Sequence, residues 1–272
     1  MPLERPMIYN FRSKCIMSHS IHDINDRLVA AGKLEHRPIY VYGSDNIPKG
    51  AMQVSALLTT GHRCLAKAIF KQSVNEGIPP LYLGKDALKG CCYGAQSWLG
   101  FITFPKSMED MLTGKSDAEA MFLKSSPEVC RKSLQNIGKI TPPADYIVMS
   151  TDADLKGHEK VLSVVCFGSA EQIRNLCALV HFSETRIFEP IMAPWGSHCS
   201  LFVAYPAGMA ENAPKDTAFL GPNAPDGNSW FPEDIMALSM PIGMARRISE
   251  DYGNSFAVKA PEMTFPKSRE IV

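Results

Sequence analysis

The sequence predicts an α/β or α+β fold, with a mixed β-sheet flanked by helices and two lobes in one compact unit. Short segments rich in β-branched and aromatic residues, such as 37–43 and 161–167, have the composition of strands. Segments with apolar residues at helical spacing, such as 169–180, alternate with them. The chain has 272 residues, 45% hydrophobic and 21% charged, which is enough to build a sizeable core.

The first half of the chain contains a polar start and then the first lobe. Residues 1–36 form a polar N-terminal segment, in which residues 21–34 have apolar positions at helical spacing. Residues 37–141 are expected to form the first lobe. Its predicted elements are a strand at 37–43, a helix capped by Thr60 that runs to Lys71, a strand at 81–84, a helix at 95–101, a helix from a Ser116–Glu119 capping box to Leu123, and a helix after Ser126-Pro127.

The prolines at 142 and 143 mark the predicted boundary, because the pattern after them changes to alternating strands and helices. Residues 142–272 are therefore expected to form a second, α/β lobe. Its predicted elements are strands at 146–149 and 161–167, a helix at 169–180 with a Ser169–Gln172 capping box, an edge strand at 186–191, a short helix at 195–204, strands at 218–221 and 235–241, a helix at 242–248 and an irregular tail after Tyr252.

Charge and hydropathy exclude several functional classes. Lys plus Arg and Asp plus Glu each total 28, and there is no basic run, which argues against nucleic acid as the main partner. No apolar stretch is long enough to span a bilayer, and the N-terminus lacks the features of a signal peptide. We therefore expect a cytoplasmic protein with no membrane association. Its expected partner is a small-molecule ligand or a redox partner, and a homo-oligomer stays open.

The eight cysteines of the chain divide into two groups. In a cytoplasmic protein they are expected to be reduced, and thus to be core residues, metal ligands or reactive thiols. Cys166 lies in an apolar strand, while Cys130 and Cys177 lie on apolar helix faces, which indicates core packing for all three. Cys15 lies in a loop or at a strand end, and its context favours no role.

The other four cysteines share a predicted position within about a turn of a helix N-terminus. There the N–H groups and the helix dipole stabilise a thiolate, which is the form that binds metal or attacks an electrophile. A glycine precedes or flanks each one, which permits tight turns and close approach to a ligand. The intervals between them match neither C-x-x-C nor the ferredoxin patterns, so spacing alone does not establish a shared site. These residues are Cys64, Cys91, Cys92 and Cys199.

Several of these segments together resemble the family known as "domain of unknown function 169", over residues 38–248. The family has no settled activity, but it has recurring cysteines at positions similar to Cys64, to one of Cys91 and Cys92, and to Cys199. The resemblance therefore implies that these cysteines share a site. The segments that carry it are Cys64 at its helix start, Cys91-Cys92-Tyr93-Gly94-Ala95, Pro143-Ala144-Asp145-Tyr146-Ile147-Val148, residues 165–173, Gly196-Ser197-His198-Cys199-Ser200 and residues 234–241.

The first functional hypothesis is a cysteine-ligated metal centre in the cleft between the lobes. Four thiolates suit a four-iron (4Fe-4S) iron–sulfur cluster or, alternatively, zinc. If only three of them bind, an open coordination position is left for a small molecule, as redox or Lewis-acid chemistry requires. The ligands would be Cys64, Cys91, Cys92 and Cys199.

Two alternatives use the same region without a metal. A thiol enzyme would take Cys91 or Cys92 as its nucleophile, with His62 or His198 as the base. A small-molecule binding module with structural cysteines would instead present an apolar pocket. Its aromatic lining would come from Tyr93, Trp195, Trp230 and Phe231.

Overall fold

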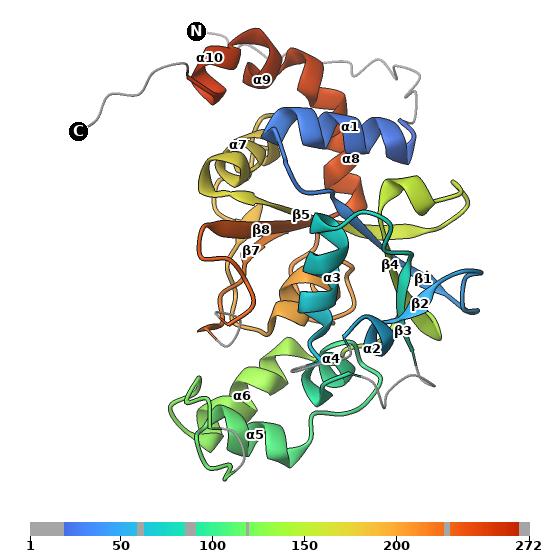
Figure 1. The fold of residues 1–272 in the computed structure, drawn as a ribbon. Helices are drawn as coiled ribbons and strands as arrows, with labels where there is room; N and C mark the ends of the chain where they lie inside the picture. Colours follow the sequence, from blue (N-terminus) through green and yellow to red (C-terminus); the bar gives the residue numbers. More distant parts are fainter. Residues whose placement is uncertain (1–18, 59–62, 85–90, 118–119, 226–228, 267–272) are drawn as a thin grey trace, which may run out of the picture.

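The structure, a computed structural model, describes residues 19–58, 63–84, 91–117, 120–225 and 229–266. In this part of the chain one mixed eight-stranded sheet has the order β2-β3-β4-β1-β5-β8-β7-β6, with helices on both faces (Figure 1). The prediction of an α/β fold with a mixed sheet is confirmed. The strands are β1 (Ile39–Ser44), β2 (Met52–Gln53), β3 (Leu81–Gly84), β4 (Tyr146–Ser150), β5 (Val161–Ser169), β6 (Ile191–Met192), β7 (Ala218–Gly221) and β8 (Ile235–Pro241).

The strands from the two halves of the chain interleave in the sheet. β4 follows the proline pair at 142–143, yet it lies between β3 and β1, antiparallel to both. β1 also pairs antiparallel with β5, and β5 with β8. The two predicted lobes therefore share one sheet, and only its two outermost pairs, β2–β3 and β6–β7, are parallel.

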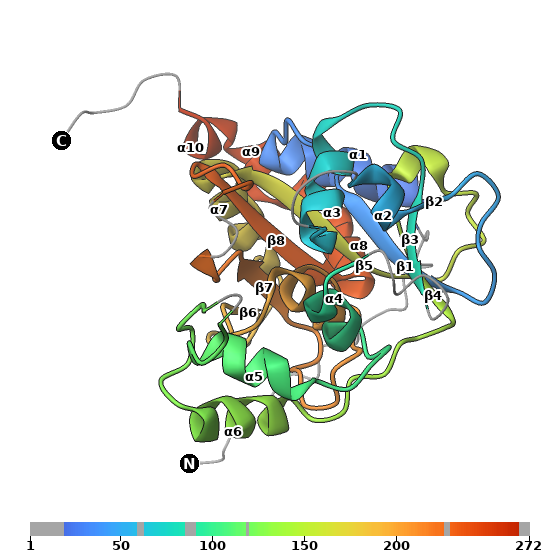
Figure 2. The same ribbon diagram turned by 60° about the horizontal axis from the view of Figure 1, so that its bottom comes forward.

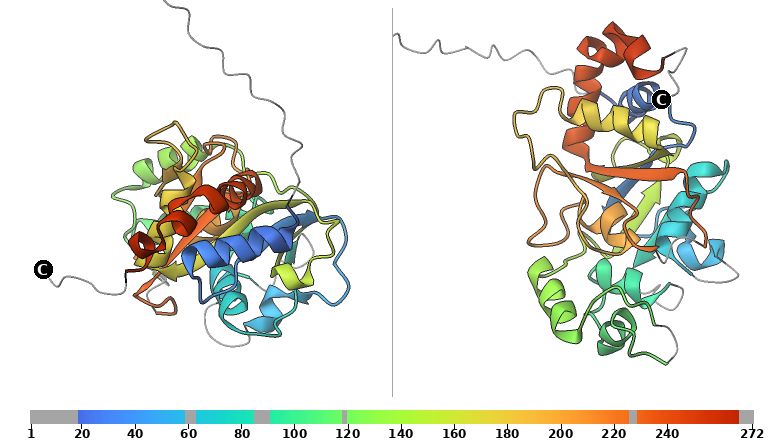
Figure 3. Two further views of the ribbon diagram at one scale, coloured as in Figure 1. Left: turned by 90° about the horizontal axis from the view of Figure 1, so that it is seen from above. Right: turned by 90° about the vertical axis from the view of Figure 1, so that its left-hand side faces the viewer.

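Side chains of the central strands alternate between two hydrophobic cores, because successive residues of a strand point to opposite faces. Ile39 and Val41 belong to one core, and Tyr40 and Tyr42 to the other. We call the side of Ile39 and Val41 the thiol face and the side of Tyr40 and Tyr42 the helix face. Figure 3 shows the helices of the two faces as separate layers on either side of the sheet.

Three amphipathic helices cover the helix face, and their starts follow from local sequence signals. Ser20 and Asp23 form a capping box at the first helix, and Ser169 and Gln172 form the predicted capping box at the second. The third begins directly after Pro241 at the end of β8. These helices are α1 (Ile21–Gly32), α7 (Ala170–Val180) and α8 (Ile242–Asp251).

The thiol face is covered by helices of four to ten residues, and one of them begins later than predicted. The helix expected from Thr60 begins at Leu65, because Arg63 and Cys64 are extended. Thr60 itself lies outside the described residues. The helices of this face are α2 (Val54–Leu57), α3 (Leu65–Val74), α4 (Tyr93–Trp98) and η3 (Ser200–Ala204).

Two further helices form a small separate unit beyond the end of the sheet, which we call the helical cap (Figure 2). Met108, Leu112 and Cys130 make its own hydrophobic cluster. Arg131 Nη1 donates to Glu109 Oε1 at 2.7 Å and so links the two helices. The helical cap consists of α5 (Lys106–Leu112), the following segment 113–126 and α6 (Pro127–Ile137).

The sequence prediction is partly wrong within the helical cap. The start of α6 is confirmed, with Ser126 as its N-cap and Pro127 in its first turn. The helix expected from the Ser116–Glu119 capping box is wrong, since residues 120–123 are not helical. Met121 N instead donates to Met111 O at 2.9 Å, which folds this segment back along α5.

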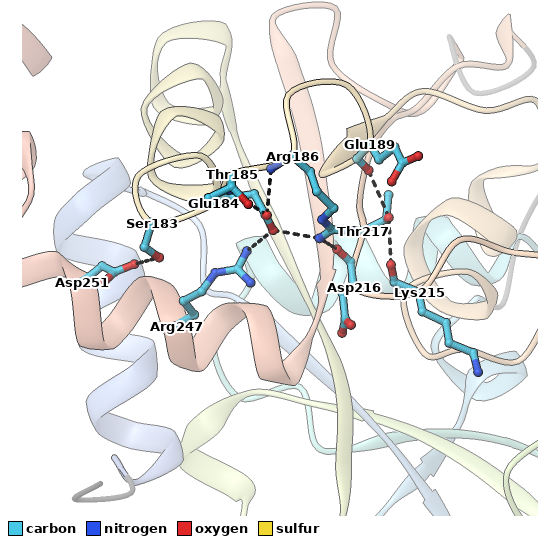
Figure 4. Close-up of polar contacts among 10 residues, drawn as sticks. All are labelled: Ser183, Glu184, Thr185, Arg186, Glu189, Lys215, Asp216, Thr217, Arg247 and Asp251. Atoms are coloured by element: carbon cyan, nitrogen blue, oxygen red, sulfur yellow. Dashed lines mark hydrogen bonds and ion pairs between the residues drawn. The ribbon is translucent and has the colours of Figure 1, made fainter. Parts of the chain in front are cut away.

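The predicted edge strand at 186–191 is reduced to the two residues of β6. The preceding loop is held by ion pairs, and the backbone N–H groups of Thr185 and Arg186 donate to the Glu184 carboxylate (Figure 4). Arg186 Nη2 donates to Glu184 Oε2 at 2.8 Å, and Arg247 Nη2 of α8 lies 3.6 Å from the same oxygen. Thr217 Oγ1 donates to Glu189 O at 3.1 Å on the other side of the loop. The loop is therefore fixed to α8 and to the start of β7.

The chain after Tyr252 is also more regular than predicted. Ser255 caps a short helix by accepting a hydrogen bond from Ala257 N at 3.3 Å. No helix in the described residues has both the length and the apolar character that crossing a membrane requires. The remaining short elements are η2 (Asp152–Asp154), η5 (Tyr252–Asn254), α9 (Phe256–Lys259) and α10 (Pro261–Thr264).

Candidate functional site

Three cysteines stand at the N-caps of three short helices on the thiol face. Cys64 is the N-cap of α3, Cys92 of α4 and Cys199 of η3. Cys92 Sγ accepts a hydrogen bond from Ala95 N at 3.4 Å, as a serine N-cap would. The prediction that these cysteines lie at helix starts is confirmed. Each sulfur is thus close to the positive end of a helix.

The cysteine pair at 91 and 92 is tied to the residue that precedes Cys64. Cys92 N donates to Arg63 O at 3.2 Å, and Cys91 Sγ lies 3.5 Å from the same oxygen. Gln96 Nε2 donates to Cys91 O at 2.8 Å and fixes the pair from the α4 side. Segments that are distant in sequence are therefore adjacent at the starts of α3 and α4.

Cys199 reaches the same place through the turn before η3. A Cβ atom on Gly196 would lie 2.2 Å from Ser200 Oγ, so only glycine allows this turn to approach the helix so closely. Tyr205 OH donates to Trp195 O at 3.2 Å and closes the turn from the other end. As a result the thiol of Cys199 forms a hydrogen bond with the thiol of Cys64.

The contacts between the thiols change their acidity in opposite directions. The hydrogen bond from Cys199 lowers the pKa of Cys64, although burial acts against this. The same hydrogen bond, together with burial, raises the pKa of Cys199 well above its ordinary value. A hydrogen bond with Cys92 and then burial raise the pKa of Cys91. Of Cys64, Cys91 and Cys199, only Cys64 is therefore favoured as a thiolate.

The three N-cap cysteines line the floor of a cavity of about 380 Å³ between the thiol face and the helical cap. The opposite wall comes from the helical cap, and Tyr93, Trp98 and Trp195 add aromatic rings to the lining. This size is at the lower end of the range for small-molecule sites. The cavity is lined by Cys64, Cys92, Tyr93, Gly94, Ala95, Trp98, Pro105, Ser107, Met108, Met111, Leu112, Ser116, Met121, Leu123, Trp195, Gly196, Ser197, His198, Cys199 and Ala224.

The sequence profile of "domain of unknown function 169", described as "uncharacterised ArCR", matches residues 27–251. The chain belongs to this family. The match includes every strand of the sheet and all three N-cap cysteines, and it confirms the resemblance drawn from the sequence motifs. Comparison with curated proteins and with solved structures finds no match.

Some of the other residues predicted for the site line the cavity in this family member, and others do not. His198 is buried, lines the cavity and packs against Trp230, with ring centroids 5.3 Å apart. His62 lies outside the described residues. Tyr93 and Trp195 line the cavity as predicted. Trp230 and Phe231 do not, since Phe231 packs on Phe70 in the core with ring centroids 5.0 Å apart.

Several cavity residues of the family member were not predicted from the sequence. Trp98 is buried at the end of α4 and contacts Trp195 edge to face, with ring centroids 5.8 Å apart. Three methionines of the helical cap form much of the opposite wall. Two of them are three residues apart on α5, a helical spacing that would have placed them on one face had α5 been predicted. They are Met108, Met111 and Met121.

The remaining cysteines of the family member are separate from this site. Cys166 is fully buried on the helix face, where burial raises its pKa to about 12. Cys130 belongs to the cluster of the helical cap, and Cys177 is partly buried on α7. Cys15 lies outside the described residues. Within the described residues, no group of three or more His, Cys, Asp or Glu side chains is spaced as a metal site.

Proposed function

We propose that the protein binds a small molecule in the cavity and holds a thiophilic metal centre, an iron–sulfur cluster or zinc, on the cysteines of its floor. The observation that carries this proposal is that Cys64, Cys92 and Cys199, from three distant segments, line one cavity. Cys91 is not among the lining residues. A centre with three cysteine ligands and one position open to the cavity would use these residues, whose sulfurs would have to move closer together, since within the described residues they are not spaced as a metal site.

The chemistry of the donor set fits such a centre. Thiolates are the ligands of zinc and of iron–sulfur clusters, whereas hard cations such as Mg²⁺ prefer oxygen. The N-cap positions favour the thiolate form that ligation requires. His198 also lines the cavity and could supply a nitrogen ligand or a hydrogen bond to the bound molecule.

The residues of the chain have three tasks in this proposal. The N-cap backbone of α3, α4 and η3 positions the sulfurs, and the buried side chains around them exclude water. Trp98 and Trp195 form an aromatic wall against which a ligand can be oriented. A bound metal would supply Lewis acidity or redox capacity next to that ligand.

Elemental analysis of anaerobically prepared protein tests this proposal. We expect iron with acid-labile sulfide, or zinc, in stoichiometric amount. Cys64→Ser and Cys199→Ser should each lose most of the metal. Cys166→Ser, the same change in a buried cysteine of the helix face, should retain it. Folded wild-type protein without metal, or metal retained in both site variants, would contradict the proposal.

A second candidate, a metal-free thiol enzyme, is favoured by one specific observation. The hydrogen bond from Cys199 lowers the pKa of Cys64, which makes Cys64 the better nucleophile, while the pKa of Cys91 is raised. We therefore assign the nucleophile in this alternative to Cys64 in place of Cys91. His198 lines the same cavity and would be the base.

Iodoacetamide labelling as a function of pH separates the two candidates. The thiol enzyme requires that Cys64 of metal-free protein reacts at a pH well below that of an ordinary cysteine. Cys177, which is partly buried and has a pKa raised to about 11, is the internal comparison. Equal, slow labelling of Cys64 and Cys177 would rule out the thiol enzyme. Protection of Cys64 only in metal-loaded protein would support the metal centre.

A further inference from the structure

We propose that the ligand of the cavity is an uncharged, largely apolar molecule, whose one polar end contacts the cysteine floor. This inference rests on the proposed function, because it names the class of molecule that the same cavity binds. It is drawn from the charge, the composition and the layout of the cavity walls.

The described lining contains no Asp, Glu, Lys or Arg side chain. A charged ligand enclosed there would lose its hydration without gaining an ionic partner, which is strongly unfavourable. Two cations of the helical cap, Lys124 and Arg131, are already engaged by other partners. Lys124 Nζ lies 3.6 Å from the centroid of the Trp195 ring and donates to Ser133 Oγ at 2.8 Å, and Arg131 pairs with Glu109.

Trp195 lies between Lys124 and the ligand cavity. It lines the cavity and also a second, smaller one, which is lined by Lys124, Ser133 and Asn136 on the other side. The positive charge of Lys124 therefore belongs to a different cavity.

The wall opposite the cysteines is apolar and adaptable. Met108, Met111 and Met121 contribute flexible thioether side chains, and Leu112 and Leu123 complete the surface. These residues come from the helical cap, which has a small core of its own. Methionine-rich surfaces adapt to ligands of different shape. We therefore infer that the cavity discriminates strongly between ligands of different charge and weakly between ligands of different shape.

The polar groups of the cavity are concentrated at its floor, with two serine hydroxyls on the cap side. Cys64, Cys199 and His198 come together there, and each can accept or donate a hydrogen bond. A ligand with one hydroxyl or carbonyl end and an apolar body would form a hydrogen bond with the floor and pack against the apolar wall of the helical cap. Aromatic bodies are favoured, because Trp98 and Trp195 flank the space.

Three probes of matched size and different charge test this inference on the purified full chain. They are 2-(1-naphthyl)ethanol, 1-naphthylacetate and 2-(1-naphthyl)ethylamine, with affinity measured by calorimetry at neutral pH. We expect the alcohol to bind at least about tenfold more tightly than the acid or the amine. Equal or tighter binding of either ion would overturn the inference, as would no binding of any probe.

A matched pair of substitutions locates the selectivity in the cavity. Met111→Lys places a cation in the apolar wall and should shift the preference towards the acid by about tenfold or more. Met192→Lys makes the same change on β6, where the side chain is 37% exposed, and should keep the wild-type preference. A reversal in both variants, or in neither, would overturn the assignment to this cavity.

The probes also distinguish failure of this inference from failure of the proposed function. Metal-free protein that still prefers the alcohol would contradict the metal centre and retain the ligand class. Metal-loaded protein that prefers the acid or the amine would contradict the ligand class and retain the metal centre. If Met111→Lys does not fold by circular dichroism, the comparison of probes on wild-type protein decides the inference alone.

Discussion

The two faces of the sheet are built differently, although the same strands supply both. The helix face is covered by three helices of 10 to 12 residues, and two of them begin with reciprocal capping boxes. On the thiol face, α4 and η3 have six and five residues. Three of the helices on the thiol face have cysteine at the N-cap, where the helix face uses serine and proline. The helix face is therefore organised for stability, and the thiol face presents its helix ends to a cavity.

A buried cysteine on each face shows what this difference does to sulfur chemistry. Cys166 on the helix face has only apolar surroundings, and burial raises its pKa to about 12. Cys64 on the thiol face is also buried, yet the hydrogen bond from Cys199 lowers its pKa. Burial alone raises the pKa of a thiol, and a hydrogen-bond donor beside a buried thiol lowers it.

The largest expected effect comes from removing a large side chain from the core of one face. Phe167 is fully buried on the thiol face, and its ring centroid lies 5.3 Å from those of Phe70 and Phe202. We expect Phe167→Ala to reduce the free energy of unfolding by about 3–5 kcal/mol. It should also weaken ligand binding, because Phe202 belongs to η3. Urea unfolding and probe titration measure the two effects.

A matched change on the other face sharpens this comparison. Leu176 is fully buried on α7, and Leu176→Ala should reduce the free energy of unfolding by about 2–5 kcal/mol. Its folded fraction should keep the metal content and probe affinity of the wild type. Equal loss of ligand binding in both variants would show that the faces are not independent.

A smaller effect is expected from the helix caps. Ser169→Ala removes one half of the capping box of α7 and should reduce the free energy of unfolding by about 1 kcal/mol. Cys92→Ala removes a sulfur acceptor 3.4 Å from Ala95 N, which is a weak hydrogen bond, so we expect a smaller loss. Metal content should change in the opposite order: Cys92→Ala should lose metal, and Ser169→Ala should retain it. A larger loss of stability in Cys92→Ala would contradict this division of roles.

The smallest effect concerns the ion pairs that fix the loop at 181–190. Hydrogen bonds from Arg186 and from the backbone lower the pKa of Glu184 from 4.5 to about 2. Because the folded pKa is depressed, Glu184 contributes stability above pH 4.5, and this contribution is lost as the pH falls towards 2. We expect Glu184→Gln to flatten the acid side of the stability curve slightly, as followed by urea midpoints.

Glu233→Gln is the control for that experiment, since Glu233 is exposed and lies between β7 and β8, away from this loop in the sequence. Its acid profile should match that of the wild type. A profile in which both variants differ from the wild type by the same amount would assign the effect to net charge in place of the ion pair.

How well the sequence predicted each region follows from how local its signals are. The strands predicted at 146–149 and 161–167 and the helix predicted after Ser169 are confirmed, because periodicity and capping lie within each segment. The edge strand expected at 186–191 is confirmed only at Ile191, in the two-residue β6, because the residues before it form a loop that Arg247 of α8 holds through Glu184. Contacts of this kind between distant residues leave no local pattern.

The candidate site shows the same limit. The helix starts at Cys64, Cys92 and Cys199 could be predicted, since glycines and polar residues near each one mark a turn. Their meeting was expected only from the family resemblance, because it depends on how distant segments pack on one face of the sheet. The methionine wall was missed, since α5 has no strong cap and methionine is common as core filler.

Cadmium titration of metal-free protein, followed by the ultraviolet absorbance of cadmium–thiolate bonds, tests the central claim most directly. If the three N-cap cysteines share one centre, absorbance should saturate at one ion per chain. It should fall in each of Cys64→Ser, Cys92→Ser and Cys199→Ser, and stay unchanged in Cys166→Ser. Absorbance that is absent in the wild type, or equal in all four variants, would contradict a shared thiolate centre.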